Sequence, residues 1–121
     1  MQWIKQQFAY ITGARAERQA ETFLTSQGLV LIARNYRCKS GEIDLIMTDS
    51  EQWVFIEVKY REKDDYGDAA EFFDKRKKKR LMRAINHYMI SKQLNPEMTA
   101  YRVDLVAING EQINWIKSAT Q

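Results

Sequence analysis

The chain has 121 residues, of which 45% are hydrophobic and 29% are charged. These values indicate one folded domain, residues 1–121, and exclude a disordered chain. The longest apolar run has five residues, which excludes a transmembrane helix, and the N-terminus lacks the apolar core of a secretory signal. A single cysteine, Cys38, excludes an internal disulfide, so the cytoplasm is the expected location.

Positive charge is concentrated in one segment of the chain. The formal net charge is only +3, but residues 75–83, "KRKKKRLMR", hold seven basic residues and no acidic one. Elsewhere 12 basic residues stand against 16 acidic ones, so the remainder is mildly acidic. We therefore expect a polyanionic partner to be met at this segment.

The predicted elements alternate between helical and strand periodicity along the chain. They are a helix over residues 13–28 with Gly28 as its stop, strands over 29–37, 42–47 and 53–60, a helix over 68–93, and strands over 101–108 and 112–118. The second and third strands read as an antiparallel hairpin, and the last two pair across an Asn-Gly turn. This order predicts an α/β fold, with a mixed sheet of about five strands flanked by helices.

One predicted strand carries charge among apolar residues. In "WVFIEVKY", Glu57 and Lys59 share one face, because strand side chains alternate between faces. A two-residue turn at Ser50 and Glu51 would place Asp44 of the preceding strand directly opposite Glu57. The hypothesis depends on this register, because a slip of one residue would separate the two acids.

The strand before that turn is expected to alternate as well. Ile43, Leu45 and Met47 should share one face, and Asp44 should share the other with Ile46. Two facing carboxylates repel, so a metal cation, a shared proton or a nearby lysine must offset their charges. Two carboxylates that hold one hard cation are the usual arrangement for Mg²⁺, which can polarise a phosphoryl oxygen.

The helices add further candidate residues. Glu17 lies at the edge of the apolar stripe of the first helix, and Lys77 lies midway between Phe73 and Leu81 on the inward seam of the second. The other basic residues of this helix can fan outward to contact backbone phosphates without reading sequence. They are Lys75, Arg76, Lys78, Lys79, Arg80 and Arg83.

Each feature also has an alternative interpretation. The acids and Lys59 could form an ordinary surface salt-bridge cluster, the basic run a solvated helix face, and Glu17 a surface acid. Three hypotheses stay open: a metal-dependent nuclease, a nucleic-acid-binding module without chemistry, and a protein-interaction domain. The third rests on an apolar face at the N-terminus that could dock a partner, form a homodimer or pack on its own core. This face consists of Trp3, Ile4, Phe8 and Ile11.

Several stretches of the chain resemble a known protein family. "AERQAETFL", "GEIDLI", "FIEVKYR", "YGDAAEFFDKRKKKRL" and "YRVDLVAI" together resemble the YraN-like family of small bacterial proteins, over nearly the whole chain. These proteins are grouped with restriction-endonuclease-like folds and are described as endonucleases distantly similar to Holliday-junction resolvases. The resemblance thus implies a single restriction-endonuclease-like domain over residues 1–121.

The resemblance also implies an activity and roles for individual residues. The wider superfamily carries Pro-Asp followed by (Asp/Glu)-X-Lys, and here Ile43 replaces the proline. By this analogy Asp44 and Glu57 would bind Mg²⁺ or Mn²⁺, Lys59 would position the attacking water, and Glu17 would support the metal site or its water. The implied reaction is hydrolysis of phosphodiester bonds in branched or structured nucleic acid, with DNA favoured over RNA as the substrate. The alternative is a binding module that retains the nuclease fold without its chemistry.

Overall fold

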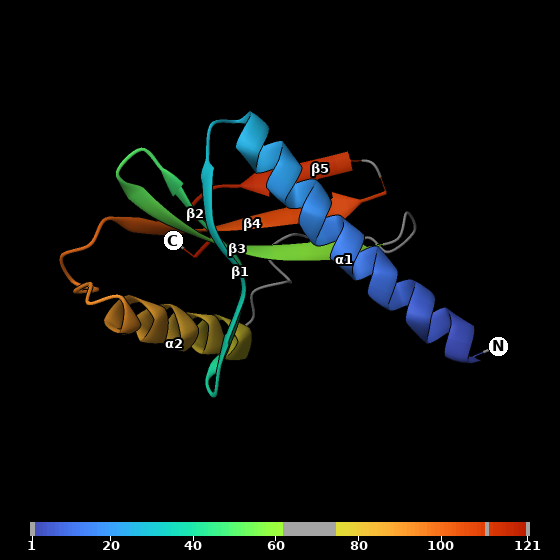
Figure 1. Ribbon diagram of the computed structural model, residues 1–121, viewed down its shortest axis with the longest axis horizontal. Helices are drawn as coiled ribbons and strands as arrows, with labels where there is room; N and C mark the ends of the chain where they lie inside the picture. The colour runs from blue at the N-terminus through green and yellow to red at the C-terminus, as the bar shows by residue number, and fades with distance from the viewer. Residues whose placement is uncertain (1, 62–74, 111, 121) are drawn as a thin grey trace.

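The computed structural model shows helices and strands in the predicted order (Figure 1). It describes residues 2–61, 75–110 and 112–120, with side chains described from residue 13 onward except at residue 61. Within these ranges a mixed five-stranded sheet is flanked by two helices, which confirms the predicted α/β fold. The elements are α1 (Gln2–Ser26), β1 (Val30–Cys38), β2 (Gly41–Asp49), β3 (Gln52–Arg61), α2 (Lys75–Ser91), β4 (Tyr101–Asn109) and β5 (Gln112–Ile116).

The sheet separates two layers of helix. Its strands follow the order β1-β2-β3-β4-β5, and neighbours are antiparallel except for the parallel pair β3 and β4. α1 packs on one face, where Leu24 joins a core that includes Ile56. α2 packs on the opposite face, where Ile85 joins a core that includes Phe55 (Figure 1). Because Phe55 and Ile56 are adjacent on β3, the alternation of one strand feeds both cores.

α1 starts 11 residues before the predicted start at Gly13 and continues through this glycine. Its end is as predicted, because Gly28 takes a φ of 100° and lies just beyond the last turn. The N–H of Leu29 donates to the carbonyl of Leu24 at 3.1 Å, which is the outer bond of a Schellman cap. Among the described side chains of this helix, residues 13–26, those of Ala16, Ala20 and Leu24 are buried.

α2 lies within the range predicted for it, residues 68–93, and is described from Lys75 onward. Phe73 and the rest of residues 68–74 lie outside the described part of the chain. Lys77 was predicted to point inward, but the prediction is wrong, because residues 75–80 are all exposed. The buried side of α2, in its described part, begins only at Leu81. No helix in the described ranges is long and apolar enough to cross a membrane.

The hairpin of β2 and β3 has the predicted register. Its two-residue turn consists of Ser50 and Glu51, and Ser50 has a φ of 57°, as such tight turns require. From the turn, the strands pair without a shift as far as Leu45 and Ile56. The turn therefore fixes which face each later side chain on β3 takes.

Candidate active site

The candidate site lies where β2 and β3 stop pairing. The ladder ends at Leu45 and Ile56, so Asp44 and Glu57 come next on the two strands, as predicted. In place of a further ladder bond, the backbone N–H of Val58 donates to Asp44 Oδ2 at 2.8 Å. One carboxylate oxygen of Asp44 is thus fixed to β3, and the strands separate beside it.

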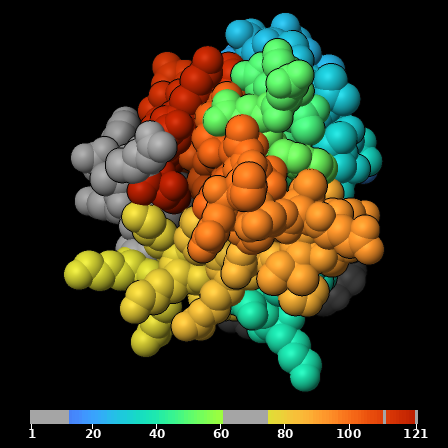
Figure 2. All heavy atoms as spheres, turned by 90° about the vertical axis from the view of Figure 1, so that its left-hand side faces the viewer, coloured from blue at the N-terminus to red at the C-terminus, as the bar shows by residue number. Residues whose placement is uncertain are grey.

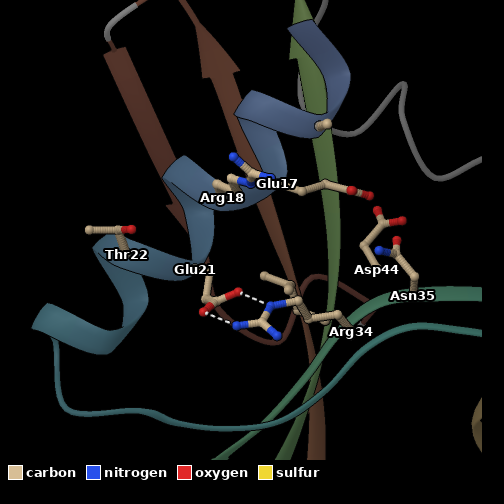
Figure 3. Close-up of a pocket in the computed structure, with 9 residues that line it drawn as sticks. Glu17, Arg18, Glu21, Thr22, Arg34, Asn35 and Asp44 are labelled. Carbon is tan, nitrogen blue, oxygen red and sulfur yellow. Dashed lines mark hydrogen bonds and ion pairs between the residues drawn. The ribbon is translucent and has the colours of Figure 1, made fainter. Parts of the chain in front are cut away.

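The regular alternation of side chains between the two faces of the sheet is broken in β2 at Asp44. Leu45 belongs to the core under α1, but Ile43 belongs to the core under α2, so the prediction that both share a face is wrong. The neighbouring β1 has a left-handed residue at the same level, Asn35, with a φ of 51°. Such a residue interrupts the alternation of a strand. The irregularity turns the Asp44 carboxyl group towards α1 rather than towards Ile46 on the α2 face (Figure 3).

A cavity of about 560 Å³ lies between α1 and the first two strands. Glu17 reaches into it from α1, and its carboxyl group points at that of Asp44 (Figure 3). One turn further along α1, Glu21 accepts two hydrogen bonds from Arg34 of β1, at 2.6 and 2.9 Å. The lining residues are Ala14, Glu17, Arg18, Glu21, Thr22, Arg34, Asn35, Asp44 and Leu45. The Glu21–Arg34 pair ties α1 to β1 at the level where Glu17 meets Asp44.

Glu57 and Lys59 lie on β3, next to Asp44 of β2. Their side chains are 21% and 25% exposed, and Lys59 Nζ lies 3.2 Å from Glu57 Oε1. Neither residue lines the cavity described above. Both act electrostatically on Asp44, and Glu17 does so from α1. The four predicted residues are therefore brought together, with Asp44 at the centre.

Burial changes the protonation of the three acids. It raises the pKa of Glu57 to about 7, and the nearby Asp44 charge adds to this, although Lys59 opposes it. Burial and Asp44 likewise raise the pKa of Glu17 to about 7. The pKa of Asp44 is also raised, chiefly by burial, although the N–H of Val58 favours its charged form. Near neutral pH the group therefore retains protons that exposed carboxyl groups would have released.

The donor atoms of this group fit a hard divalent cation. All are carboxylate oxygens, the ligands that Mg²⁺ and Mn²⁺ prefer, and a cation would relieve their mutual repulsion. Asp44 and Glu57 are the residues that could hold it, with Glu17 in reach of Asp44. Within the described residues, however, no group of three or more His, Cys, Asp or Glu side chains is arranged to hold a metal ion.

The sequence matches the family described as "Uncharacterised protein family UPF0102" over residues 16–108. The chain belongs to family UPF0102. The UPF0102 protein of Shewanella loihica is 47% identical over 107 residues, which cover 88% of this chain and 91% of that protein. The UPF0102 protein of Photorhabdus laumondii is 40% identical over 116 residues, covering 96% and 92%. The family that the motifs resemble is thus confirmed, and the names of these relatives state no activity.

The raised pKa of Glu57 predicts how the stability of this UPF0102 protein depends on pH. From pH 4.5 to about 7 the folded chain keeps a proton that the unfolded chain releases, so its stability falls as the pH rises through this window. Glu57→Gln removes this loss. Without divalent cations, we expect the variant to exceed the wild type above pH 7 by on the order of 2 kcal/mol, and to match it at acidic pH.

Thermal unfolding in a chelator, measured across this pH range, checks the expectation. Glu97→Gln, on an exposed loop, is the matched control and should follow the wild-type curve. A Glu57→Gln curve parallel to that of the wild type would show that the carboxyl group is not held protonated by its surroundings.

The predicted basic residues of the UPF0102 chain do not join the acidic cluster. All of residues 75–80 are exposed on α2, as is Arg83, and none lines the cavity beside α1. They lie on the helix that covers the opposite face of the sheet (Figure 1). A polyanion bound by these basic residues would therefore contact α2 and not the cavity that Glu17 and Asp44 line.

Sequence reasoning missed a buried polar network on β4. Asp104 is 0% exposed and accepts hydrogen bonds from Arg102 Nε, Trp115 Nε1 and the backbone N–H of Ser118, at 2.9 to 3.1 Å. Arg102 Nη1 also donates to Asp49 Oδ2 at 3.2 Å. The available signal was the same as in β3, namely two opposite charges two residues apart in the apolar strand "YRVDLVAI".

Proposed function

We propose that this UPF0102 protein is a Mg²⁺- or Mn²⁺-dependent nuclease that hydrolyses phosphodiester bonds in nucleic acid, with DNA favoured over RNA as its substrate. The observation that carries the proposal is the gathering of Glu17, Asp44, Glu57 and Lys59 where β2 and β3 separate. Carboxyl groups whose pKa values are raised by burial and by one another cluster at functional sites, which supports a catalytic role for this group. A restriction-endonuclease-like architecture and action in the cytoplasm are parts of the same proposal.

Each residue has a distinct task in this reaction. A cation held by Asp44 and Glu57 would supply Lewis acidity at the phosphoryl oxygen. Lys59, held 3.2 Å from Glu57, can donate hydrogen bonds to the attacking water and balance the charge that develops on the phosphate. Glu17, with a pKa of about 7, can accept the proton of that water at neutral pH. Hydrolysis forms one P–O bond from the water oxygen and breaks one bridging P–O bond.

A second candidate is a nucleic-acid-binding module without chemistry. The exposure of the basic residues of α2, away from the acids, favours it, because binding through this helix needs no carboxylate. It predicts salt-sensitive binding that persists without divalent cations and after loss of Asp44. A protein-interaction role depends on residues 3–11, whose side chains lie outside the described part of the structure.

Incubation of the purified chain with duplex, flap, junction and RNA substrates tests the proposed function. We expect cleavage of at least one substrate with Mg²⁺ or Mn²⁺, and none with a chelator. Calorimetric titration of each cation, with and without an oligonucleotide, should give saturable binding. The absence of both cleavage and cation binding would reject the nuclease and leave the binding module.

A further inference from the structure

The hairpin that joins β1 to β2 is fixed against one side of α2. A Cβ atom on Gly41 would lie 3.0 Å from the backbone oxygen of Arg80, so hairpin and helix touch at the backbone. Tyr36 OH is hydrogen-bonded to His87 Nδ1 at 2.5 Å, and its ring packs edge-on against that of Tyr88 at 5.1 Å. The side of α2 that carries His87 therefore faces the hairpin.

Helical geometry places three arginines on this same side. Residues 7 and 11 positions apart differ by about 20° around an α-helix, and residues four apart by about 40°. Counted back from His87, these spacings reach Arg80, Arg76 and Arg83 in turn. All three are exposed.

The opposite side of α2 is also marked by a contact. Lys78 Nζ donates to the backbone oxygen of Thr120 at 2.9 Å, so this side faces the C-terminal segment. Lys75 lies three residues earlier and shares the side. The basic run, which reads in the sequence as one block, is thus divided between two surfaces.

The hairpin adds its own positive charges beside the arginines of α2. Lys39 is exposed, and the Arg37 side chain is 76% exposed. Arg37 pairs with Glu42 at 3.1 Å, but an ion pair this exposed contributes little and can exchange for a phosphate. Figure 2 shows the end of the hairpin, in teal, beside the yellow to gold turns of α2, with long side chains of both projecting outward.

We propose that the hairpin and the adjoining side of α2 form one binding surface for the phosphate backbone of duplex nucleic acid. Its residues are Arg37, Lys39, Arg76, Arg80 and Arg83. Guanidinium groups pair with phosphate in a bidentate manner, and packing against α2 fixes the hairpin backbone that carries Arg37 and Lys39 before binding. Lys75 and Lys78 lie outside this surface. The inference rests on the proposed function, since it names how the substrate of the same protein is held.

Charge-matched double variants test the surface. We compare Arg37→Gln/Lys39→Gln on the hairpin and Arg76→Gln/Arg80→Gln on the adjoining side of α2 with Lys75→Gln/Lys78→Gln on its far side. Each removes two charges. Binding of a fluorescent DNA duplex is measured by anisotropy in a chelator over a series of salt concentrations, so that cleavage does not interfere. Thermal unfolding verifies that each variant is folded.

The first two variants are expected to lose affinity about tenfold and to lower the slope of log affinity against log salt by about two, since each lost phosphate contact removes about 0.9. The far-side variant should keep its affinity within about twofold of the wild type and should keep the wild-type salt slope. Equal losses in all three, or no loss on the hairpin side while the wild type binds, would overturn the inference. If the wild type cleaves nucleic acid but the hairpin variants bind the duplex as tightly as the wild type, the proposed surface is rejected and the nuclease is retained. If the variants show the expected losses of binding but the wild type cleaves no substrate, only the nuclease is rejected.

Discussion

Asp44→Asn is expected to lower the rate of phosphodiester cleavage by at least about 10³-fold, because a loss of several kcal/mol of transition-state stabilisation has this effect. The substitution is conservative for the fold, since the Asn amide oxygen can still accept the N–H of Val58. It removes the negative charge at the centre of the acidic cluster, and with it the carboxylate that would share a divalent cation with Glu57 in the proposed nuclease. Binding of nucleic acid should remain or become tighter, because a charge that repels phosphate is lost.

Single-turnover cleavage with saturating protein measures this effect apart from binding. Asp49→Asn is the matched control, because it makes the same change on the same strand, at the end of β2 and away from the acidic cluster. It should cleave at nearly the wild-type rate. An Asp44→Asn variant as active as this control would exclude Asp44 from the chemistry, and the acidic cluster would then be structural.

Asp104→Ala is expected to cost about 3–5 kcal/mol of stability, the usual result when one partner of a buried ion pair is removed. Arg102, whose side chain is 10% exposed, would keep its charge inside the fold without its main acceptor. The donors on Trp115 and Ser118 would lose their acceptor as well. In a domain of this size, a loss this large lowers the melting temperature by about 10–20 °C.

Chemical denaturation with a linear extrapolation gives the free energy of unfolding of each variant. Asp49→Asn again serves as the control. Its bond to Arg102 belongs to the same network, but the Asp49 side chain is 39% exposed, so a loss below about 1 kcal/mol is expected. Arg102→Met added to Asp104→Ala should recover part of the stability, since no buried charge then remains. If Asp104→Ala costs no more than Asp49→Asn, the network contributes little to the stability of the fold.

The parts of the fold that local sequence encodes were predictable. Tight turns fix register, so the turn at Ser50 and Glu51 placed Asp44 and Glu57 next to each other along β2 and β3. Gly28 ended α1 for the equally local reason that glycine tolerates a left-handed backbone. The position of Glu17 near the sheet was also predictable, because the apolar stripe of a helix identifies which of its polar residues lie near the sheet.

Features that depend on distant or irregular structure were not predictable. The alternation rule assumes a regular strand. Asn tolerates a left-handed backbone but does not require one, so Asn35 alone could not predict the change of face at Asp44. The periodicity of α2 continues through Lys77, but which turns of the helix become buried is decided by tertiary packing. The partners of Asp104 come from three separate segments, so only the assembled fold reveals them.

The parallel pairing of β3 with β4 has a consequence for synthesis of the chain. Its partners, such as Trp53 and Tyr101, are separated by the whole crossover, and at about 5–20 residues per second the ribosome needs roughly 2–8 s to deliver β4 after β3. During this interval β3 exposes an unpaired apolar edge, of the kind that joins strands of other chains. Glu57 and Lys59 stand directly after that apolar stretch. The charges that the proposed nuclease would use for catalysis are therefore also expected to act as gatekeepers that keep nascent chains apart.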